Sequence, residues 1–303
     1  MSVTPINPMR VNRIFPVLFV LLFVSALQAV EIRIAASDLL ADCLRPSFES
    51  FEKENEVEVK FEAIGSLPAM DRLYSDEIDM AIIALPEDSE LPREDFRAYP
   101  LAYDSSIIIT AKSNPIDEIN LAQLGGIFGT IEDFSFDTWG DLGQSVGDNR
   151  NIRAIAGVKS ESISLELFRH TVLSEVSSRN SVSVVRADEV EKIVAADATS
   201  IAITSGLPEN QRVKTLMVSR GGQEPAFGPS RGNIHFGDYP IRLSFFVLFD
   251  PRDAEKLNGI IRALLSDSVA ENLEANDFFS LPATVRQQFL TELEFDFQTL
   301  PED

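Results

Sequence analysis

Cysteine and histidine are scarce in this chain of 303 residues, which contains one cysteine and two histidines. Cys43 has no partner for an intramolecular disulfide, and His170 and His235 lie far from it and from each other in the sequence. Transition-metal sites need three or four such ligands close together. We therefore expect no metal site and no cofactor.

Positively charged residues and long apolar segments are also scarce. Lysine and arginine number 26 against 48 aspartates and glutamates, which gives a net charge of −22. Nucleic acids and anionic membranes attract basic proteins, so we do not expect a chain this acidic to bind either of them. After residue 29, no segment is long and apolar enough to be expected to cross a membrane.

The first 29 residues have the layout of a secretory signal peptide. Arg10 and Arg13 precede the apolar run IFPVLFVLLFVSALQA, which ends in small residues and is shorter than the roughly 20 residues of a membrane-spanning helix. The alternative is a retained membrane anchor. We expect cleavage after Ala29, a periplasmic or otherwise exported protein with no stable membrane insertion, and a net charge of −24 once the two arginines are removed.

Cys43, in the sequence LLADC, has some similarity to a lipid-attachment site. It lies beyond the end of the apolar run, however, and Asp42 is an unfavourable neighbour for that processing. We expect Cys43 to be a small buried residue on a helix.

Strand and helix patterns alternate between residues 31 and 86. EIRIAAS stops at Ser37-Asp38, a helix N-cap signal, and is followed by a helical run that Pro46 is expected to interrupt. A second strand ends at Gly65-Ser66, and a short helix leads to the apolar strand IDMAIIALP. This order predicts a parallel sheet whose ligands bind beyond the carboxyl ends of the strands. Ser37, Asp38 and Ser66 are therefore candidate ligand residues; the alternative is plain cap and turn chemistry.

A second α/β unit follows, and the chain then returns to the first. YPIRLSFFVLFD predicts the returning strand, a helix begins at Asp250-Pro251, and the tail predicts a closing helix. We predict one lobe from residues 30–105 with 239–303, and a second lobe from the inserted residues 106–238. Two crossings between the lobes would make a hinge and a cleft.

The stretch KSESISLELFRH has serines at every second position just before a helical run. Serines suit the first turn of a helix, where hydroxyls and exposed N–H groups can hold an anion. Lys159, Ser160, Ser162 and Ser164 are therefore candidate anion ligands. The alternative is an ordinary helix start beside a solvated lysine.

The segment SNPIDEINLAQLGGIFGTIEDFSFDTWGDLG resembles the interlobe segment of the periplasmic phosphate-binding proteins of ABC transporters. The family pattern is matched by Asn114, Pro115, Gln123, Leu124, Ile127, Phe128, Gly129, Trp139, Leu142 and Gly143. DYPIRLSFFVLF and FFSLP resemble the returning strand and the closing segment of that family. The resemblance implies a two-lobed α/β fold, the type 2 periplasmic-binding-protein fold, in which each lobe is a mainly parallel sheet flanked by helices.

The family binds phosphate among helix N-termini, hydroxyls, an arginine and an aspartate. The resemblance implies that three loops correspond to the phosphate loops, namely Ser37, Gly65-Ser66 and Ser162-Ile163-Ser164. The sequence departs from the pattern where Ala84 replaces the aspartate and where Gly157 or Val158 replaces the arginine, with Lys159 the nearest cation.

We expect from this resemblance a binding protein, not an enzyme, that captures a small anion such as phosphate between its lobes and delivers it to an ABC permease. The alternative is a divergent periplasmic sensor or protein-interaction module, which the missing aspartate and arginine favour. A third interpretation, an exported hydrolase, has serines and histidines in its favour but no metal cluster and no paired-carboxylate signature.

Overall fold

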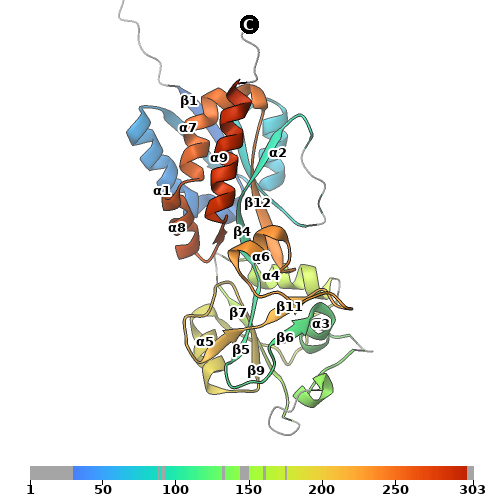
Figure 1. The fold of residues 1–303 in the computed structure, drawn as a ribbon. Coiled ribbons are helices and arrows are strands. Elements are labelled where there is room, and N and C mark those ends of the chain that lie inside the picture. The colour runs from blue at the N-terminus through green and yellow to red at the C-terminus, as the bar shows by residue number, and fades with distance from the viewer. Residues whose placement is uncertain are drawn as a thin grey trace, which may run out of the picture.

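The computed structural model of the chain describes residues 30–87, 89, 93–131, 134–143, 150–159, 162–174 and 176–298. The expected signal peptide and Ser160 lie outside these residues. The described chain forms two α/β lobes, one above the other in Figure 1, which confirms the predicted two-lobed α/β fold.

The upper lobe in Figure 1 is built on a six-stranded sheet with the order β13-β4-β12-β3-β1-β2. Its strands are β1 (Glu31–Ala36), β2 (Glu58–Ala63), β3 (Met80–Leu85), β4 (Arg97–Ser105), β12 (Arg242–Phe249) and β13 (Phe279–Ser280). β1 pairs in parallel with both β2 and β3, as the alternating strand and helix patterns predict. In β3, Met80 to Ile83 are completely buried, which explains why this strand is apolar on both faces.

The lower lobe contains a five-stranded sheet with the order β10-β5-β9-β7-β8 and a small two-stranded sheet of β6 and β11. The strands are β5 (Ile107–Ala111), β6 (Glu118–Asn120), β7 (Arg153–Val158), β8 (Ser183–Arg186), β9 (Ser200–Thr204), β10 (Val213–Thr215) and β11 (Met217–Ser219). β7 pairs in parallel with β8 and β9, whereas β5 pairs in antiparallel fashion with β9 and β10.

Most strands of each sheet run in the same direction, as expected, but both sheets are mixed. In the upper lobe, β12 returns from the lower lobe and inserts between β3 and β4, and it runs antiparallel to both. β13 adds to β4 in the same antiparallel sense. Parallel pairs such as β1 with β2 are joined by a helix, because the crossover returns the chain to the end of the sheet from which the first strand started.

Helices cover the sheets of both lobes. In the upper lobe they are α1 (Asp38–Asn55), α2 (Ser66–Tyr74), α6 (Arg231–Phe236), α7 (Ala254–Leu264), α8 (Asp267–Ala275) and α9 (Ala283–Gln298). In the lower lobe they are α3 (Leu121–Phe128), α4 (Ser164–Phe168), which continues into a π-helical turn over Arg169–Leu173, and α5 (Ala187–Ala196). Short 3₁₀ turns cover Trp139–Leu142 and Pro251–Asp253.

Several helix ends follow their sequence signals. Asn120 and Gln123 form a capping box at the start of α3, and the Asp250 side chain accepts a hydrogen bond from the amide of Arg252 ahead of α7. Pro46 does not interrupt α1, which runs through it as a single helix of 18 residues. Pro46 is exposed on the surface, where water can satisfy the carbonyl group that the proline ring leaves without a donor.

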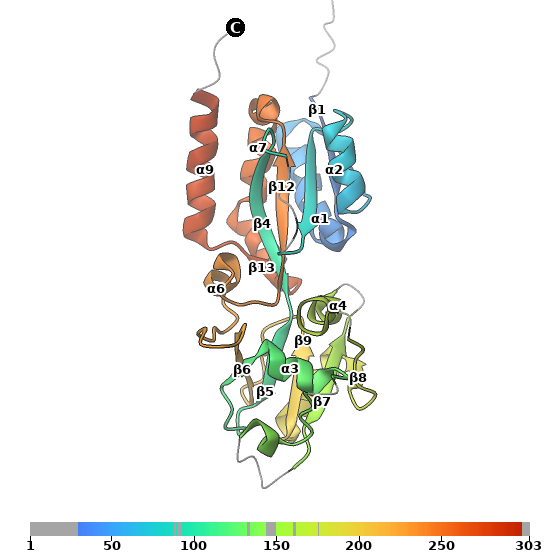
Figure 2. The same ribbon diagram turned by 90° about the vertical axis from the view of Figure 1, so that its right-hand side faces the viewer.

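Two chain segments cross between the lobes, and they are bonded to each other. β4 continues directly into β5, as Figure 2 shows, and Ser105 and Ser106 lie at the junction. Both serines donate to the carbonyl of Ile241, from the Ser105 hydroxyl at 2.7 Å and from the Ser106 amide at 3.2 Å. The hydroxyl of the buried Tyr239 donates to the Ser106 carbonyl at 2.9 Å. The hinge is thus a pair of bonded strands.

Candidate functional site

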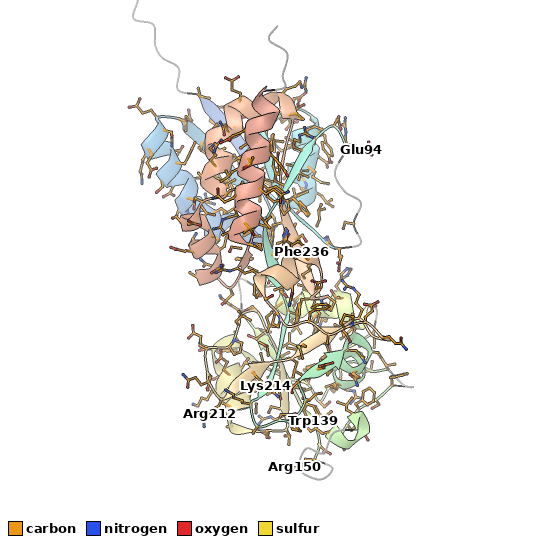
Figure 3. All side chains as sticks on the ribbon, viewed as in Figure 1. Glu94, Trp139, Arg150, Arg212, Lys214 and Phe236 are labelled. Atoms are coloured by element: carbon orange, nitrogen blue, oxygen red, sulfur yellow. The ribbon has the colours of Figure 1, made fainter. Side chains whose placement is uncertain are left out.

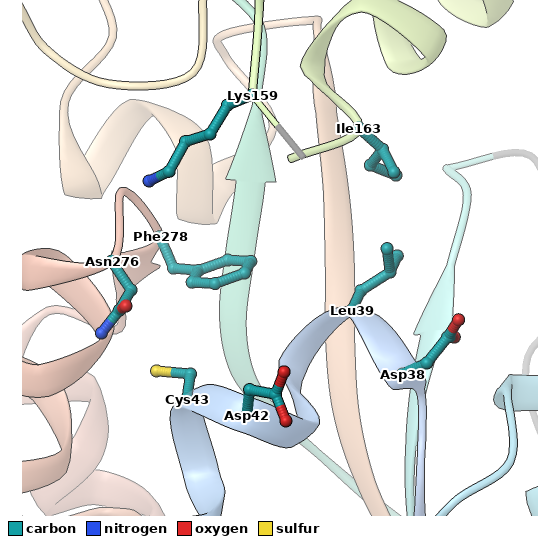
Figure 4. Close-up of a pocket in the computed structure, with 8 residues that line it drawn as sticks. All are labelled: Asp38, Leu39, Asp42, Cys43, Lys159, Ile163, Asn276 and Phe278. Carbon is teal, nitrogen blue, oxygen red and sulfur yellow. The ribbon is translucent and has the colours of Figure 1, made fainter. Parts of the chain in front are cut away.

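A cavity of about 540 Å³ lies between the lobes, and we call it the Asp38 cavity. Its lining comes from the start of α1, from the loop after β7 and from the segment after α8: Asp38, Leu39, Asp42, Cys43, Lys159, Ile163, Asn276 and Phe278. Figure 4 shows Leu39 and Ile163 facing each other from opposite lobes. The cavity includes two of the predicted ligand residues, Asp38 and Lys159.

The charge of the Asp38 cavity is mainly negative. Asp38 and Asp42 are exposed carboxylates near the start of α1. Lys159 is the single cation among the described lining residues, and its Nζ lies 2.7 Å from Oδ2 of Asp277 on the other lobe. This ion pair links the lobes. The positive charge of Lys159, which we expected to bind an anion, is therefore already paired with a carboxylate. An anion in this cavity would therefore depend on N–H and hydroxyl donors.

Ser37 stands at the junction of β1 and α1, with 2% of its surface exposed. Its amide donates to the carbonyl of Ile82 at 2.7 Å, while its hydroxyl has no hydrogen-bond partner among the residues that the structure describes. The amides of Asp38 and Leu39 begin a long helix and so have no acceptor within it. This end of α1 offers donors at the positive end of a helix dipole.

Ser66 occupies the first position of α2, after Gly65 in the left-handed region with φ +88°. Its hydroxyl oxygen accepts a hydrogen bond from the amide of Ala84 at 2.9 Å, which joins the start of α2 to the end of β3. The hydroxyl can still donate to a ligand, because only its acceptor capacity is used.

The serines before α4 have different environments. The Ser162 hydroxyl accepts from the Ser164 amide at 3.1 Å, which is the ordinary helix-start role that the sequence left open. Ser164 is 3% exposed, its carbonyl accepts from the Ser106 hydroxyl at 2.5 Å, and its own hydroxyl has no partner within the described part of the chain. Ser160 lies outside the described residues.

Asp104, which the sequence analysis missed, lies at the end of β4, where the chain passes to the lower lobe. It is 3% exposed and accepts hydrogen bonds from the amides of Ser105, at 2.7 Å, and Ile163. Burial is the main reason why the pKa of this carboxyl is raised to about 6, and the two amide bonds oppose that rise. The one available signal was a charged residue inside the otherwise apolar LAYDSSIIIT.

The expectation for Cys43 is confirmed, and Trp139 and the two histidines also have clear positions in the fold. Cys43 is buried on α1, and burial raises the pKa of its thiol to about 11. Trp139 is a packing residue: it is completely buried in the lower lobe (Figure 3), and its indole N–H donates to the carbonyl of Thr199 at 3.1 Å. His235 lies near the hinge on α6, with Nδ1 2.9 Å from the Tyr103 hydroxyl. The two histidines are on different lobes.

The pentapeptide GQSVG at 143–147 has the spacing of a hydrolase nucleophile elbow, but Gly143 follows a 3₁₀ turn, whereas an elbow follows a strand. Residues 144–149 lie outside the described residues. Within the described ranges, no group of three His, Cys, Asp or Glu side chains is placed to hold a metal ion.

The chain is a two-lobed α/β protein with a cavity between its lobes, and it belongs to the PBP superfamily: a family profile described as the PBP superfamily domain matches residues 24–268. It is 27% identical over 222 residues to the protein SphX of Synechococcus elongatus, an alignment that covers 69% of this chain and 65% of SphX. The matched region thus spans less than two thirds of the length of that relative.

Solved structures show the same fold. A possible phosphate-binding protein from Planctomyces limnophilus is similar with a TM-score of 0.67 at 17% identity, over 88% of this chain and 99% of that chain. PstS from Borrelia burgdorferi is similar with a TM-score of 0.67 at 20% identity, over 84% and 99%. An ABC-type phosphate transport receptor from Vibrio cholerae has a TM-score of 0.58 at 19% identity, over 83% and 100%.

Across the described residues, no helix is both long enough and apolar enough to span a membrane.

Proposed function

We propose that this protein is an exported solute-binding protein that captures a small oxyanion, phosphate or a close relative, between its lobes without catalysing a reaction. The observation that carries the proposal is a pair of buried serines, Ser37 and Ser164, at helix starts on opposite lobes, whose hydroxyls have no hydrogen-bond partner among the described residues. Similar solved structures include a possible phosphate-binding protein and a phosphate transport receptor, which supports phosphate as the first ligand to test.

Binding in this site would use neutral donors. The amides at the start of α1, the Ser37 hydroxyl and the Ser164 hydroxyl would donate to the anion, and lobe closure would remove water from them. Selectivity would follow from matched donors and acceptors, because a buried donor left unpaired costs about 1–3 kcal/mol. Asp38 and Asp42 would disfavour the most highly charged form of the ligand.

Export and delivery complete this proposal. A signal peptide over residues 1–29 would direct the chain to the periplasm, where residues 30–105 and 239–303 together with α6 would form one lobe and the rest of residues 106–238 the other. An ABC permease would accept the loaded and closed form. The similarity to a phosphate transport receptor of an ABC type supports this partner.

A second candidate function is a periplasmic sensor or protein-interaction module that does not serve transport. The observation that favours it is the charge of the Asp38 cavity, where two carboxylates stand near one lysine that is already paired with Asp277. Such a cavity would bind a phosphate dianion poorly, so an organic ligand or a protein partner would be preferred.

Calorimetry and thermal melting of the purified exported chain against phosphate, sulfate and related oxyanions test the first candidate. Binding to the folded state should raise its stability by about 2.7 kcal/mol at a hundredfold excess over Kd. Ser37→Ala and Ser164→Ala should each weaken binding at least fivefold, whereas Ser50→Ala, at an exposed position of α1, should not. Absence of heat and of any thermal shift with every oxyanion would exclude the first candidate and favour the second.

A further inference from the structure

A second cavity, of about 420 Å³, also lies between the lobes, and we call it the Arg242 cavity. Its described lining residues are Pro86, Glu87, Leu167, His170, Thr171, Ser174, Pro240 and Arg242, and none of them lines the Asp38 cavity. Pro86 and Glu87 follow β3 in the upper lobe, whereas Leu167 to Ser174 belong to the lower lobe. The Arg242 cavity is thus a separate interlobe space.

Two arginines converge on one carboxylate in the Arg242 cavity. Arg220, which follows β11, donates from Nη2 to Glu87 Oε1 at 3.1 Å and to Glu87 Oε2 at 3.3 Å. Arg242, on β12, donates from Nη2 to Glu87 Oε1 at 3.4 Å. Guanidinium groups match the geometry of carboxylates and phosphates better than other cationic side chains do. The Glu87 carboxylate therefore marks a position where the fold holds an oxyanion.

The guanidinium of Arg242 is fixed independently of Glu87. Its Nη1 donates to the carbonyls of Ile234, at 2.6 Å, and His235, at 2.8 Å, and its Cζ lies 5.5 Å from the ring centroid of Tyr103. Its Nε is buried and has no hydrogen-bond partner among the described residues. Arg242 would therefore keep its position if Glu87 left, so the site is preorganised for an anion.

Gly237 makes room for this arrangement. It has φ +79°, and a Cβ atom there would lie 2.9 Å from Arg242 Nη2 and 3.3 Å from Glu87 Oε1. Its carbonyl accepts from Arg220 Nη2 at 2.9 Å. A larger residue would press on the side chains of Arg242 and Glu87, so a glycine at this position leaves room for their ion pair.

The opposite wall of the cavity has an irregular backbone and polar side chains. His170 and Thr171 lie on the π-helical turn over Arg169–Leu173, and Ser174 follows it with φ 52° and ψ −109°. Turns of π-helix occur frequently at functional sites, and a strained non-glycine residue persists only where the surrounding structure holds it. These residues present an imidazole and two hydroxyls to the same cavity as Arg242.

We propose that the Arg242 cavity binds a small anion carrying a carboxylate or phosphate group, and that Glu87 occupies the position of this anion in the ligand-free chain. This site goes beyond the proposed function, because it shares no described lining residue with the Asp38 cavity. Glu87 lies on the loop after β3, and 39% of its side chain is exposed, as is 39% of Arg220. An ion pair this exposed favours the paired position of the Glu87 carboxylate by a factor of about five or less in the equilibrium constant. A ligand can therefore displace the carboxylate.

Calorimetry of the purified exported chain with propionate and with inorganic phosphate tests this proposal. Glu87→Gln removes the internal competitor, so it should bind one of these probes about fivefold more tightly than the wild type. Glu62→Gln is the matched control, because Glu62 forms a comparable exposed ion pair with Arg72 at 2.8 Å in the same lobe. This control should bind like the wild type. Which probe responds distinguishes a carboxylate ligand from a phosphate ligand.

Further variants locate the binding gained in Glu87→Gln. Adding Arg220→Met should remove the gain, and adding Ser37→Ala should leave it unchanged. The proposal is wrong if Glu87→Gln binds neither probe more tightly than the wild type, or if the gain survives Arg220→Met. It is equally wrong if Ser37→Ala abolishes the gain, because the anion would then lie at the start of α1. Failure of the wild type to bind phosphate through Ser37 would contradict the proposed function alone.

Discussion

The two interlobe cavities differ in the sign of the charge that they present. The Asp38 cavity has two carboxylates and one lysine, and Asp277 already binds that lysine. In the Arg242 cavity, the lining residue Arg242 and the neighbouring Arg220 both pair with the carboxylate of Glu87. Among the described residues, two guanidinium groups thus lie on one side of the cleft. Donors on the other side are hydroxyls and backbone amides.

This difference shows that each cavity would recognise an anion by a different mechanism. Helix amides and serine hydroxyls select an anion by the geometry of its hydrogen bonds, and they work without a cation if water is excluded. Paired guanidinium groups attract any carboxylate or phosphate, including one that the protein itself supplies. Variants that change the charge in one cavity can therefore test this difference in mechanism.

The largest expected effect concerns Asp104, which binds Ile163 of the Asp38 cavity. Its pKa of about 6 in the folded state exceeds the ordinary value of 3.8, so the folded state binds this proton more tightly than the unfolded state does. The free energy of unfolding should therefore fall as the pH rises from about 4 to about 6. We expect Asp104→Asn to be more stable than the wild type by about 2–3 kcal/mol at pH 8.

Urea unfolding of this variant and the wild type between pH 4 and pH 8 checks the prediction. The stability difference should shrink as the pH falls toward 4 and approach zero only below the ordinary pKa of 3.8, where the wild-type carboxyl is protonated in both states. A difference that stays constant with pH would show that Asp104 is not a costly buried charge.

The second largest effect is expected for Gly237→Ala in the Arg242 cavity. The substitution imposes a left-handed backbone on alanine and brings its Cβ to 2.9 Å from Arg242 Nη2, so it should cost about 1–2 kcal/mol. Gly143→Ala is the control, because Gly143 also has a positive φ of 72° but has no described atom within 4 Å of the added Cβ. If urea unfolding shows that both variants lose the same stability, the close approach of the added Cβ to Arg242 does not destabilise the protein.

The smallest effect is expected for Asp277→Asn, which releases Lys159 in the Asp38 cavity. An exposed ion pair of this kind stabilises the protein by about 0–1 kcal/mol, so the loss of stability should be slight. The affinity for phosphate should rise up to about fivefold, because Lys159 becomes available to the anion. Titration calorimetry measures this change. An unchanged or weaker affinity would show that Lys159 does not face the bound anion.

Local features of the fold could be predicted from the sequence. The alternation of strands and helices predicted the parallel pairing of β1 with β2 and β3, and the Ser37-Asp38 signal predicted the start of α1. The antiparallel insertion of β12 between β3 and β4 could not be predicted, because the pattern of a returning strand does not specify its neighbours.

Contacts between residues that are far apart in the chain could not be predicted from the sequence. Lys159 could be singled out as a cation, but its partner Asp277 is 118 positions away. Glu87 and Arg220 are 133 positions apart and meet only because the chain returns to the upper lobe. Ser66 was correctly placed at a strand end, whereas its bond to the amide of Ala84 depends on the packing of α2 against β3.

The most direct test of the account is to locate the anion itself. Crystals of the exported chain grown with arsenate, a phosphate analogue with a strong anomalous signal, would show its position. We predict an arsenic peak between the lobes within hydrogen-bond distance of the Ser37 and Ser164 hydroxyls, and a second peak between Arg220 and Arg242 when Glu87→Gln is used. Arsenate absent from both cavities, or found only on the outer surface, would contradict the claim that this protein holds an oxyanion between its lobes.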